Sequence, residues 1–288
     1  MPHFKHILFP VDFSDRCRVV QPFVISMARQ FQAKVTLLHV INIPAGWYGS
    51  MEAPYPIMFD IPAMLQSGEK QLASYLDTPG PSQIERVVQH GDPATKITAF
   101  VEQHGIDLIM MPTHGYGTFR SLLLGSVTTK VLHDADCAVW TAAHTDDPTT
   151  VEHVDYRNIL CAVDLVPESV GLIRYADDLA RLYQAKLRLV HAAPAPEIQP
   201  IGPRDDEFRR SLLEWAGERI AELQLQVGTD LEVCLAGGGV SNLVRDAALQ
   251  YSADLVVIGR GREQRSFGSL RTNAYAIIRE SPCPVLRV

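Results

Sequence analysis

The stretch KHILFPVD at residues 5–12 decides the fold, because it returns 152 positions later as RNILCAVD at residues 157–164. A second stretch, QAKVTLLH at residues 32–39, returns with the same offset as QAKLRLVH at residues 184–191. Two later matches, which begin at Asp107 in DLI and at Cys137 in CAV, have offsets of 147 and 146. A nearly constant offset along the whole chain indicates two equivalent copies of one folding unit.

We therefore expect two domains, at residues 1–143 and 157–288, joined by a linker at residues 144–156. The linker contains the polar run DDPTT, and polar segments rich in Asp, Pro and Thr are typical of exposed connections. The total of 288 residues fits two domains of the usual size, roughly 100–200 residues each.

Short apolar runs alternate with helix-length segments in both copies. The strands expected in the first copy lie at residues 5–11, 34–40, 83–89, 108–111 and 138–141, and the helices at 18–31, 64–75, 94–104 and 126–133. The strands expected in the second copy lie at 158–163, 186–191, 230–235, 255–258 and 285–287, and the helices at 169–183, 206–227, 240–251 and 270–280. This alternation predicts an α/β fold with a doubly wound, Rossmann-like parallel sheet in each copy. Ligands of such sheets bind at the carboxyl ends of the strands, where the strand order reverses.

Composition excludes several classes of protein. The formal net charge of −7 leaves no basic stripe for nucleic acid, and no apolar run reaches the roughly 18–20 residues that span a bilayer. The five cysteines are scattered without a Cys-x-x-Cys pair, which is typical of a reducing compartment. We expect a cytoplasmic protein that binds neither nucleic acid nor membranes.

The loop after the fourth strand of the first copy reads MPTHGYGTFRSLLLGS at residues 111–126. Gly115, Gly117 and Ser126 at the mouth of a helix suit an anion, because glycine allows close backbone approach and the first turn presents free N–H groups. The alternative is structural: the glycines relieve a turn and Ser126 caps the helix. Spacing alone leaves both interpretations open.

The loop and the duplication together resemble the universal stress protein family in its tandem two-domain form. The family motif is Gly-x2-Gly-x9-Gly-Ser/Thr, and the first copy has Pro112-x2-Gly115-x9-Gly125-Ser126. The resemblance covers nearly the whole chain, twice. It implies five-stranded parallel sheets of order 3-2-1-4-5, two domains that pack as an internal pseudo-dimer, and an ATP-binding protein of the stress response with Mg²⁺ held through the phosphates. We also expect two chains to form a homodimer.

Carried over residue by residue, the resemblance implies a nucleotide site in the first domain. Asp12 would accept hydrogen bonds from adenosine, and Val40 and Met111 would pack near the base. The phosphates would be held by the Ser126 hydroxyl and by the backbone N–H groups of Gly115, Gly125, Ser126 and Val127. Pro112 departs from the motif because proline has no backbone donor. The implied site consists of Pro10, Asp12, Val40, Met111, Pro112, Gly115, Gly125, Ser126 and Val127.

The second copy matches the motif less well. Its spacing is Gly261-x9-Arg271-Thr272, which places a side chain where the phosphate-touching glycine belongs, so ATP bound in the family's manner is doubtful there. Asp164, Gly259 and Gly261 are the remaining candidates for a nucleotide site. Four arginines in this loop indicate either a different anionic ligand or acidic partner, or a solvated loop paired with neighbouring acids; they are Arg260, Arg262, Arg265 and Arg271.

Other features are weaker. His39 and His191 match across the repeat, and we interpret them as satisfied, partly buried histidines. The loop at residues 41–62 is unusually apolar and predicts a lid or an interface. The sequence has neither a Walker lysine motif nor a nucleophile elbow, so we expect no fast catalysis, at most slow ATP hydrolysis. The competing hypothesis is an interaction scaffold of the same fold without nucleotide; an adenylate-forming ligase is disfavoured because its signature sequences are missing.

Overall fold

The computed structural model describes residues 3–42, 60–76, 83–114, 124–143, 154–193, 203–260 and 269–288. The chain separates into two compact units, one built mainly from His3–Trp140 and the other from Asp155–Val288. Most of the apolar loop predicted at residues 41–62, the central part of the predicted linker and the predicted site residues Gly115 and Gly261 lie outside the described residues.

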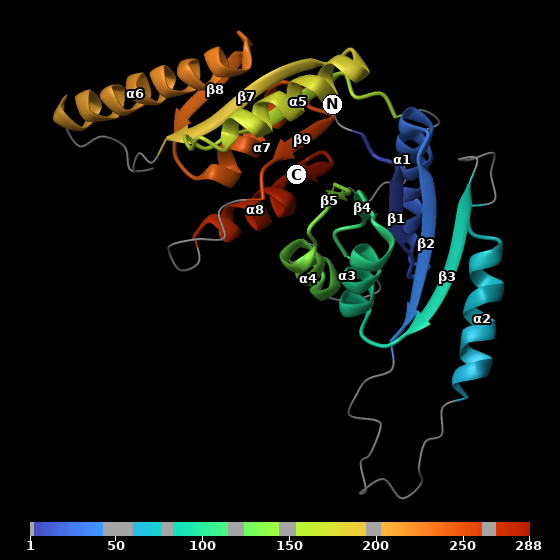
Figure 1. Ribbon diagram of the computed structural model, residues 1–288. Coiled ribbons are helices and arrows are strands. Elements are labelled where there is room, and N and C mark those ends of the chain that lie inside the picture. The colour runs from blue at the N-terminus through green and yellow to red at the C-terminus, as the bar shows by residue number, and fades with distance from the viewer. Residues whose placement is uncertain are drawn as a thin grey trace, which may run out of the picture. The chain divides into compact units, whose positions relative to one another are not determined.

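The first unit is a five-stranded parallel α/β sheet with strand order β3-β2-β1-β4-β5. β1 pairs with β2 on one side, with His6 opposite Lys34, and with β4 on the other, with Ile7 opposite Leu108. Figure 1 shows α2 alongside β3 in this unit, and α3 next to α4. Its elements are β1 (His6–Pro10), α1 (Asp15–Phe31), β2 (Lys34–Ile41), α2 (Ile61–Ala73), β3 (Ile84–His90), α3 (Pro93–His104), β4 (Leu108–Met111), α4 (Ser126–Asp134) and β5 (Ala138–Thr141).

The second unit repeats this topology with strand order β8-β7-β6-β9-β10. Its register is equivalent as well, since Asn158 lies opposite Lys186 and Ile159 opposite Leu255. The predicted doubly wound sheets of order 3-2-1-4-5 are confirmed. The elements are β6 (Asn158–Ala162), α5 (Ser169–Tyr183), β7 (Lys186–Ala193), α6 (Pro203–Val227), β8 (Glu232–Gly237), α7 (Val240–Gln250), β9 (Leu255–Ile258), α8 (Ser269–Glu280) and β10 (Val285–Arg287).

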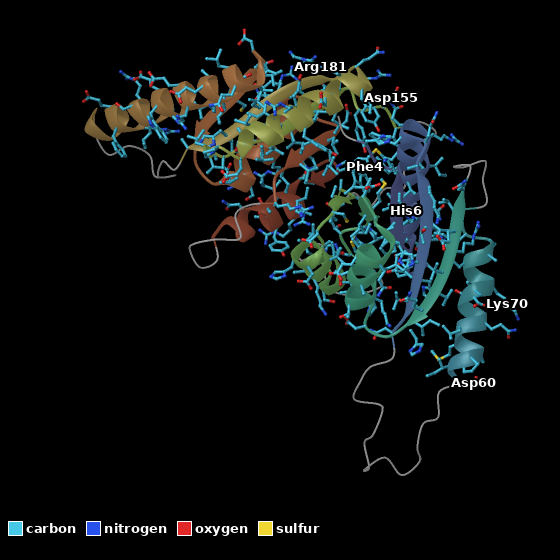
Figure 2. The ribbon with its side chains drawn as sticks, in the orientation of Figure 1. Phe4, His6, Asp60, Lys70, Asp155 and Arg181 are labelled. Carbon is cyan, nitrogen blue, oxygen red and sulfur yellow. The ribbon has the colours of Figure 1, made fainter. Side chains whose placement is uncertain are left out.

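Hydrogen bonds to the helix ends explain where several helices begin. The Ser14 side chain accepts from the Cys17 N–H at the start of α1, and the Asp92 side chain accepts from the Thr95 N–H at the start of α3. Asp60 does the same for α2 (Figure 2), which therefore begins at Ile61 rather than at the predicted residue 64. Such caps satisfy backbone donors that have no partner within the helix.

Strand β8 begins two residues later than predicted, at Glu232 instead of residue 230. The reason lies in Gln224 on α6, whose Oε1 accepts hydrogen bonds from the Leu231 N–H at 2.6 Å and from the Thr229 hydroxyl at 3.4 Å. These bonds tie residues 229–231 to the helix and delay the start of the strand.

The core of each unit consists of apolar strand residues covered by helices. Ile7, Leu8 and Phe9 of β1 are fully buried, as are Val256 and Val257 of β9. Near-continuous apolar strands of this kind are expected where helices cover both faces of a parallel sheet. These buried strands position the sheet edge at which the candidate site lies.

Candidate functional site

The candidate site of the first unit lies at the carboxyl ends of β1 and β4. These strands are parallel neighbours, with Leu8 opposite Ile109, so Pro10 and Met111 end at the same edge of the sheet. β1 has β2 on its other side, and the strand order therefore reverses here. Met111 is buried. This edge is the switch point at which ligands of doubly wound sheets bind.

Asp12 follows β1, and one of its carboxylate oxygens is engaged by the start of α1. Its Oδ1 accepts from the Ser14 N–H at 3.0 Å, from the Ser14 hydroxyl at 2.6 Å and from the Cys17 thiol at 3.0 Å. Oδ2 accepts no hydrogen bond from the rest of the described chain. Asp12 therefore supports α1 and retains one oxygen for a ligand.

Cys17 beside Asp12 is a structural thiol. Burial, and then the negative charge of Asp12, raise the pKa of the Cys17 thiol far above its ordinary value. Because the thiolate is the nucleophile in cysteine chemistry, Cys17 adds no nucleophile to the site.

The start of α4 packs closely against the loop that leaves β4. The Gly125 N–H donates to the Thr113 carbonyl at 2.9 Å, and the Thr128 hydroxyl donates to the Pro112 carbonyl at 3.1 Å. A Cβ atom at residue 125 would lie 3.3 Å from that Thr113 oxygen and 3.4 Å from the His114 Cα. Gly125 thus contributes close backbone approach, and its own N–H is used within the protein instead of facing a phosphate.

Two donors that follow Gly125 are available. No side chain caps α4, and no described group accepts a hydrogen bond from the backbone N–H of Ser126 or of Val127. Ser126 is exposed and Val127 is half-buried. A helix N-terminus with free N–H groups carries a partial positive charge and favours anions.

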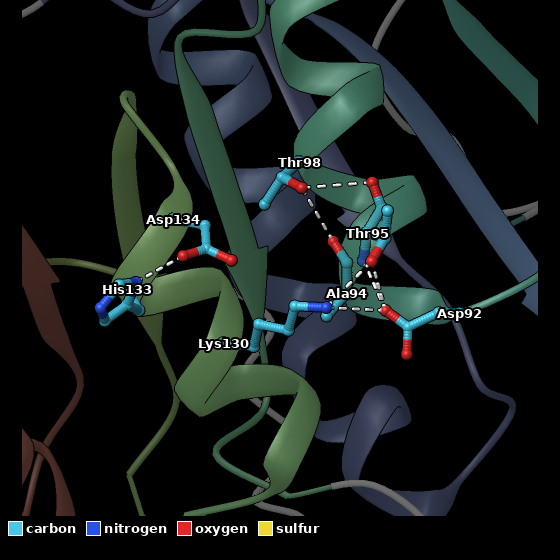
Figure 3. A network of polar contacts seen from close by, with 7 residues as sticks. All are labelled: Asp92, Ala94, Thr95, Thr98, Lys130, His133 and Asp134. Carbon is cyan, nitrogen blue, oxygen red and sulfur yellow. Dashed lines mark hydrogen bonds and ion pairs between the residues drawn. The ribbon is translucent and has the colours of Figure 1, made fainter.

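The position of α4 is held by a polar network with α3 (Figure 3). The Lys130 ammonium lies 3.1 Å from Asp92 Oδ2 and 2.9 Å from the Thr95 hydroxyl. The same Asp92 oxygen accepts from the Thr95 hydroxyl at 2.6 Å. These bonds to the Thr95 hydroxyl and amide, with the charge of Lys130, lower the pKa of Asp92 to about 2. Asp92, charged at neutral pH, thus links the two helices beside the site.

On the other side of β1, three ring side chains lie together near the end of β2. Val40 is half-buried there, and His39 Nδ1 lies 2.7 Å from the Val11 carbonyl oxygen. The Phe13 ring centroid lies 4.5 Å from that of His39 and 5.5 Å from that of Tyr75. Sequence reasoning missed Phe13 and Tyr75, because neither belongs to a motif.

The equivalent edge of the second unit differs in detail. The Ser169 hydroxyl lies 2.6 Å from Asp164 Oδ1, so Asp164 also supports the helix that follows it. A Cβ atom at Gly259 would lie 3.5 Å from Leu172, an ordinary contact, so packing does not require glycine there. A cavity of about 820 Å³ opens at this edge, and Asp164 and Gly259 both line it.

Comparison with known proteins identifies the family. The profile of the universal stress protein family matches residues 3–142 and, a second time, residues 155–288. The chain therefore belongs to the universal stress protein family, of which it carries two domains. None of the described helices has the length and apolarity needed to cross a membrane.

Individual relatives match one copy or both. Universal stress protein A of Escherichia coli K12 is 32% identical over 112 residues, 38% of this chain and 78% of that protein. Universal stress protein MJ0531 of Methanocaldococcus jannaschii is 27% identical over 138 residues, 47% of this chain and 80% of that protein. A universal stress protein structure from Archaeoglobus fulgidus covers 99% of this chain and 97% of that chain with a TM-score of 0.67 and 22% identity. That likeness shows the same fold.

Proposed function

We propose that the first unit binds an adenine nucleotide, ATP with Mg²⁺ held through its phosphates, and that the protein has a regulatory role in the stress response. The observation that carries the proposal is the uncapped start of α4, where the N–H groups of Ser126 and Val127 are donors at the switch point of the sheet. Oxygen-rich anions such as phosphates are the ligands that such a terminus favours.

The remaining residues fit the two ends of a nucleotide. Asp12 has Oδ2 available to accept from a ribose hydroxyl or an adenine amine, and Met111 and Val40 offer apolar surface at the strand ends. Pro112 and Gly125 supply no donor, since proline lacks an N–H and the Gly125 N–H is bonded to Thr113. The phosphate contacts therefore fall to Ser126, Val127 and the glycine loop before them.

Binding rather than rapid turnover suits this arrangement. Among the described residues the candidate site holds Asp12 as its acid, and that carboxylate is committed at Oδ1 to Ser14 and Cys17. General base catalysis needs a group within reach of the proton that it removes. Besides Asp12, the described residues at this edge include His114, a buried side chain whose Nδ1 lies 3.3 Å from the Thr113 hydroxyl. Slow ATP hydrolysis is the most that we propose.

The test removes one donor while leaving the helix intact. Ser126 is the first residue of α4, where proline is favoured, and Gly125 has φ −59° and ψ 147°, a conformation that suits the residue before proline. In calorimetric titrations of the full chain with ATP and Mg²⁺, we expect Ser126→Pro to weaken binding about tenfold, the loss of one charged hydrogen bond. Ser126→Ala is the matched control, because it keeps the N–H and loses only the hydroxyl.

Three outcomes decide the proposal. Binding of about one ATP per chain that Ser126→Pro weakens more than Ser126→Ala supports it. Equal affinities of wild type and Ser126→Pro show that the start of α4 holds no phosphate. No heat of binding in the wild type favours the scaffold without nucleotide. Light scattering of the same samples tests the associated expectation of a homodimer, and domain-specific crosslinking tests the internal pseudo-dimer.

A further inference from the structure

The cavity in the second unit has the size of a small-molecule site and a mainly apolar lining. Its volume is about 820 Å³, within the roughly 300–1,000 Å³ of small-molecule pockets. Aliphatic side chains dominate its wall, among them Val163 after β6, Leu172 of α5, Ile258 of β9 and Ile277 of α8. Such a wall favours a ligand that is largely apolar.

One buried polar atom in this wall has no partner. His191 is only 8% exposed, and its Nδ1 lies 2.8 Å from the Val163 carbonyl oxygen. Because a carbonyl oxygen can only accept, Nδ1 carries the proton, and Nε2 of the neutral ring is an acceptor. Nε2 is buried without a hydrogen-bond partner among the described residues. Buried polar atoms in native proteins are nearly always hydrogen-bonded, so this atom indicates a ligand with an O–H or N–H donor.

A second unsatisfied polar atom belongs to the same cavity. Tyr175 of α5 lines it, and the buried Tyr175 hydroxyl also has no hydrogen-bond partner in the described part of the chain. Burial raises the pKa of Tyr175 well above its ordinary value, so the phenol stays neutral and can donate or accept. The cavity thus offers two buried hydrogen-bonding groups within an apolar wall.

The charges around the cavity do not favour a polyanion. Among the described lining residues, Asp164 and Glu168 are acidic and Arg260 is basic, which leaves an excess of negative charge. Like charges at close range are unfavourable.

We propose that the second unit binds an uncharged, mainly apolar small molecule that donates an O–H or N–H hydrogen bond to Nε2 of His191, the chemistry of phenols and indoles. This inference concerns a different unit and a different ligand class from the ATP site, and it stands or falls independently of nucleotide binding. The two domains of the chain would then respond to different small molecules.

The test uses 2-naphthol as the probe and the full chain as the protein. Its fluorescence reports binding, naphthalene is the matched ligand without the donor, and 2-naphthyl phosphate is the matched anion. We expect one 2-naphthol per chain, bound at least about fivefold more tightly than naphthalene and than 2-naphthyl phosphate, with or without saturating ATP. The ATP titration of Ser126→Pro is a separate measurement, so failure of either proposal leaves the other intact.

Two variants separate the hydrogen bond from the fold. His191→Asn retains a short amide donor for the Val163 carbonyl and removes the acceptor at Nε2. We expect it to weaken 2-naphthol about tenfold, the loss of one hydrogen bond, and to leave naphthalene unchanged, which shows that the cavity persists. Ala274→Trp, which fills the cavity from α8, should abolish binding of both ligands.

A matched control lies in the first unit. His104 Nδ1 also contacts a backbone carbonyl, that of Phe100 at 3.0 Å, and His104→Asn should change neither ligand's affinity. The proposal is overturned if 2-naphthol does not bind, if it binds no more tightly than naphthalene, or if 2-naphthyl phosphate or ATP displaces it from the cavity with higher affinity.

Discussion

His39 fixes the backbone that leads into the candidate nucleotide site, with its Nδ1 2.7 Å from the carbonyl oxygen of Val11. The second unit repeats this bond, since His191 Nδ1 lies 2.8 Å from the carbonyl of Val163. Both bonds agree with the interpretation of these histidines as satisfied side chains, except at Nε2 of His191. The two units therefore share the same histidine–carbonyl hydrogen bond between the second strand and the end of the first.

His39 is expected to stabilise the first unit through this bond. His39→Phe keeps a ring against Phe13 and leaves the Val11 carbonyl without its donor, which should cost about 1–3 kcal/mol of unfolding free energy. His39→Asn can still donate to that carbonyl and should cost less. Urea denaturation followed by circular dichroism measures both variants, and equal losses in the two would contradict a role for the hydrogen bond.

The apolar runs and the duplication were sufficient to predict the fold. The strands at Leu108–Met111 and Leu255–Ile258 are found at the predicted residues, because buried parallel strands are continuous apolar runs. The shifted starts of α2 and β8 depend on hydrogen bonds that the side-chain oxygens of Asp60 and Gln224 accept. Hydrophobic periodicity carries no information on such bonds.

The candidate site was predictable in position and less so in chemistry. The strand ends and the loop motif placed Asp12 and Ser126 at the sheet edge. They did not reveal that Asp12 Oδ1 accepts from Ser14 or that the Gly125 N–H donates to the Thr113 carbonyl. The sequence did not predict the cavity in the second unit, because the glycine motif concerns phosphate binding alone. A cavity depends on the sizes of side chains that meet from α5, β7 and α8, which no linear pattern specifies.

Two equivalent aspartates, one in each unit, should stabilise the amino ends of β1 and β6, at the sheet edge away from the candidate site. Asp107 Oδ2 accepts from the N–H groups of Lys5 at 2.7 Å and of His6 at 2.9 Å, and Asp254 Oδ2 accepts from Arg157 and Asn158, each at 2.8 Å. Hydrogen bonds to a charged group are worth about 1.5–3 kcal/mol each, and less when exposed. We expect Asp107→Asn and Asp254→Asn each to lower the melting temperature by several degrees.

Their combination tests the independence of the two aspartates. They share no partner in the described chain, so the double variant should lose the sum of the two single losses. Calorimetry of the four proteins measures this, and a double variant no less stable than either single variant would refute independent roles.

Asp92 should make stability depend on pH in the acidic range. Hydrogen bonds from Thr95, with the charge of Lys130, lower the pKa of Asp92 from 3.8 to about 2. A depressed folded-state pKa contributes stability that is present above the unfolded value and is lost as the pH falls toward 2. Because the side chain is 60% exposed, solvent screening keeps this contribution small.

The comparison is between wild type and Asp92→Ala. At pH 6 we expect the variant to be less stable by about 1 kcal/mol, the usual value of a helix cap, and the difference to shrink between pH 4 and pH 2. Lys130→Gln should show a smaller loss with the same direction of pH dependence. Thermal melts at several pH values measure the differences, and a gap that stays constant down to pH 2 would exclude the charged cap.

Gly125 directly precedes α4 and Gly259 directly follows β9, and the two glycines should respond differently to a methyl group. At Gly125 the new Cβ meets backbone atoms of Thr113 and His114 at 3.3 and 3.4 Å, whereas at Gly259 it meets the end of Leu172 at 3.5 Å. Backbone cannot move aside as a side chain does, so Gly125→Ala should cost about 1–3 kcal/mol and push α4 away from the β4 loop. We expect weaker ATP binding in that variant, because the Ser126 and Val127 donors move with the helix. The unfolding free energy of Gly259→Ala should stay within about 0.5 kcal/mol of wild type. Chemical denaturation and ATP titration of both variants measure the two effects. Equal losses of unfolding free energy in the two variants would refute the close packing of α4.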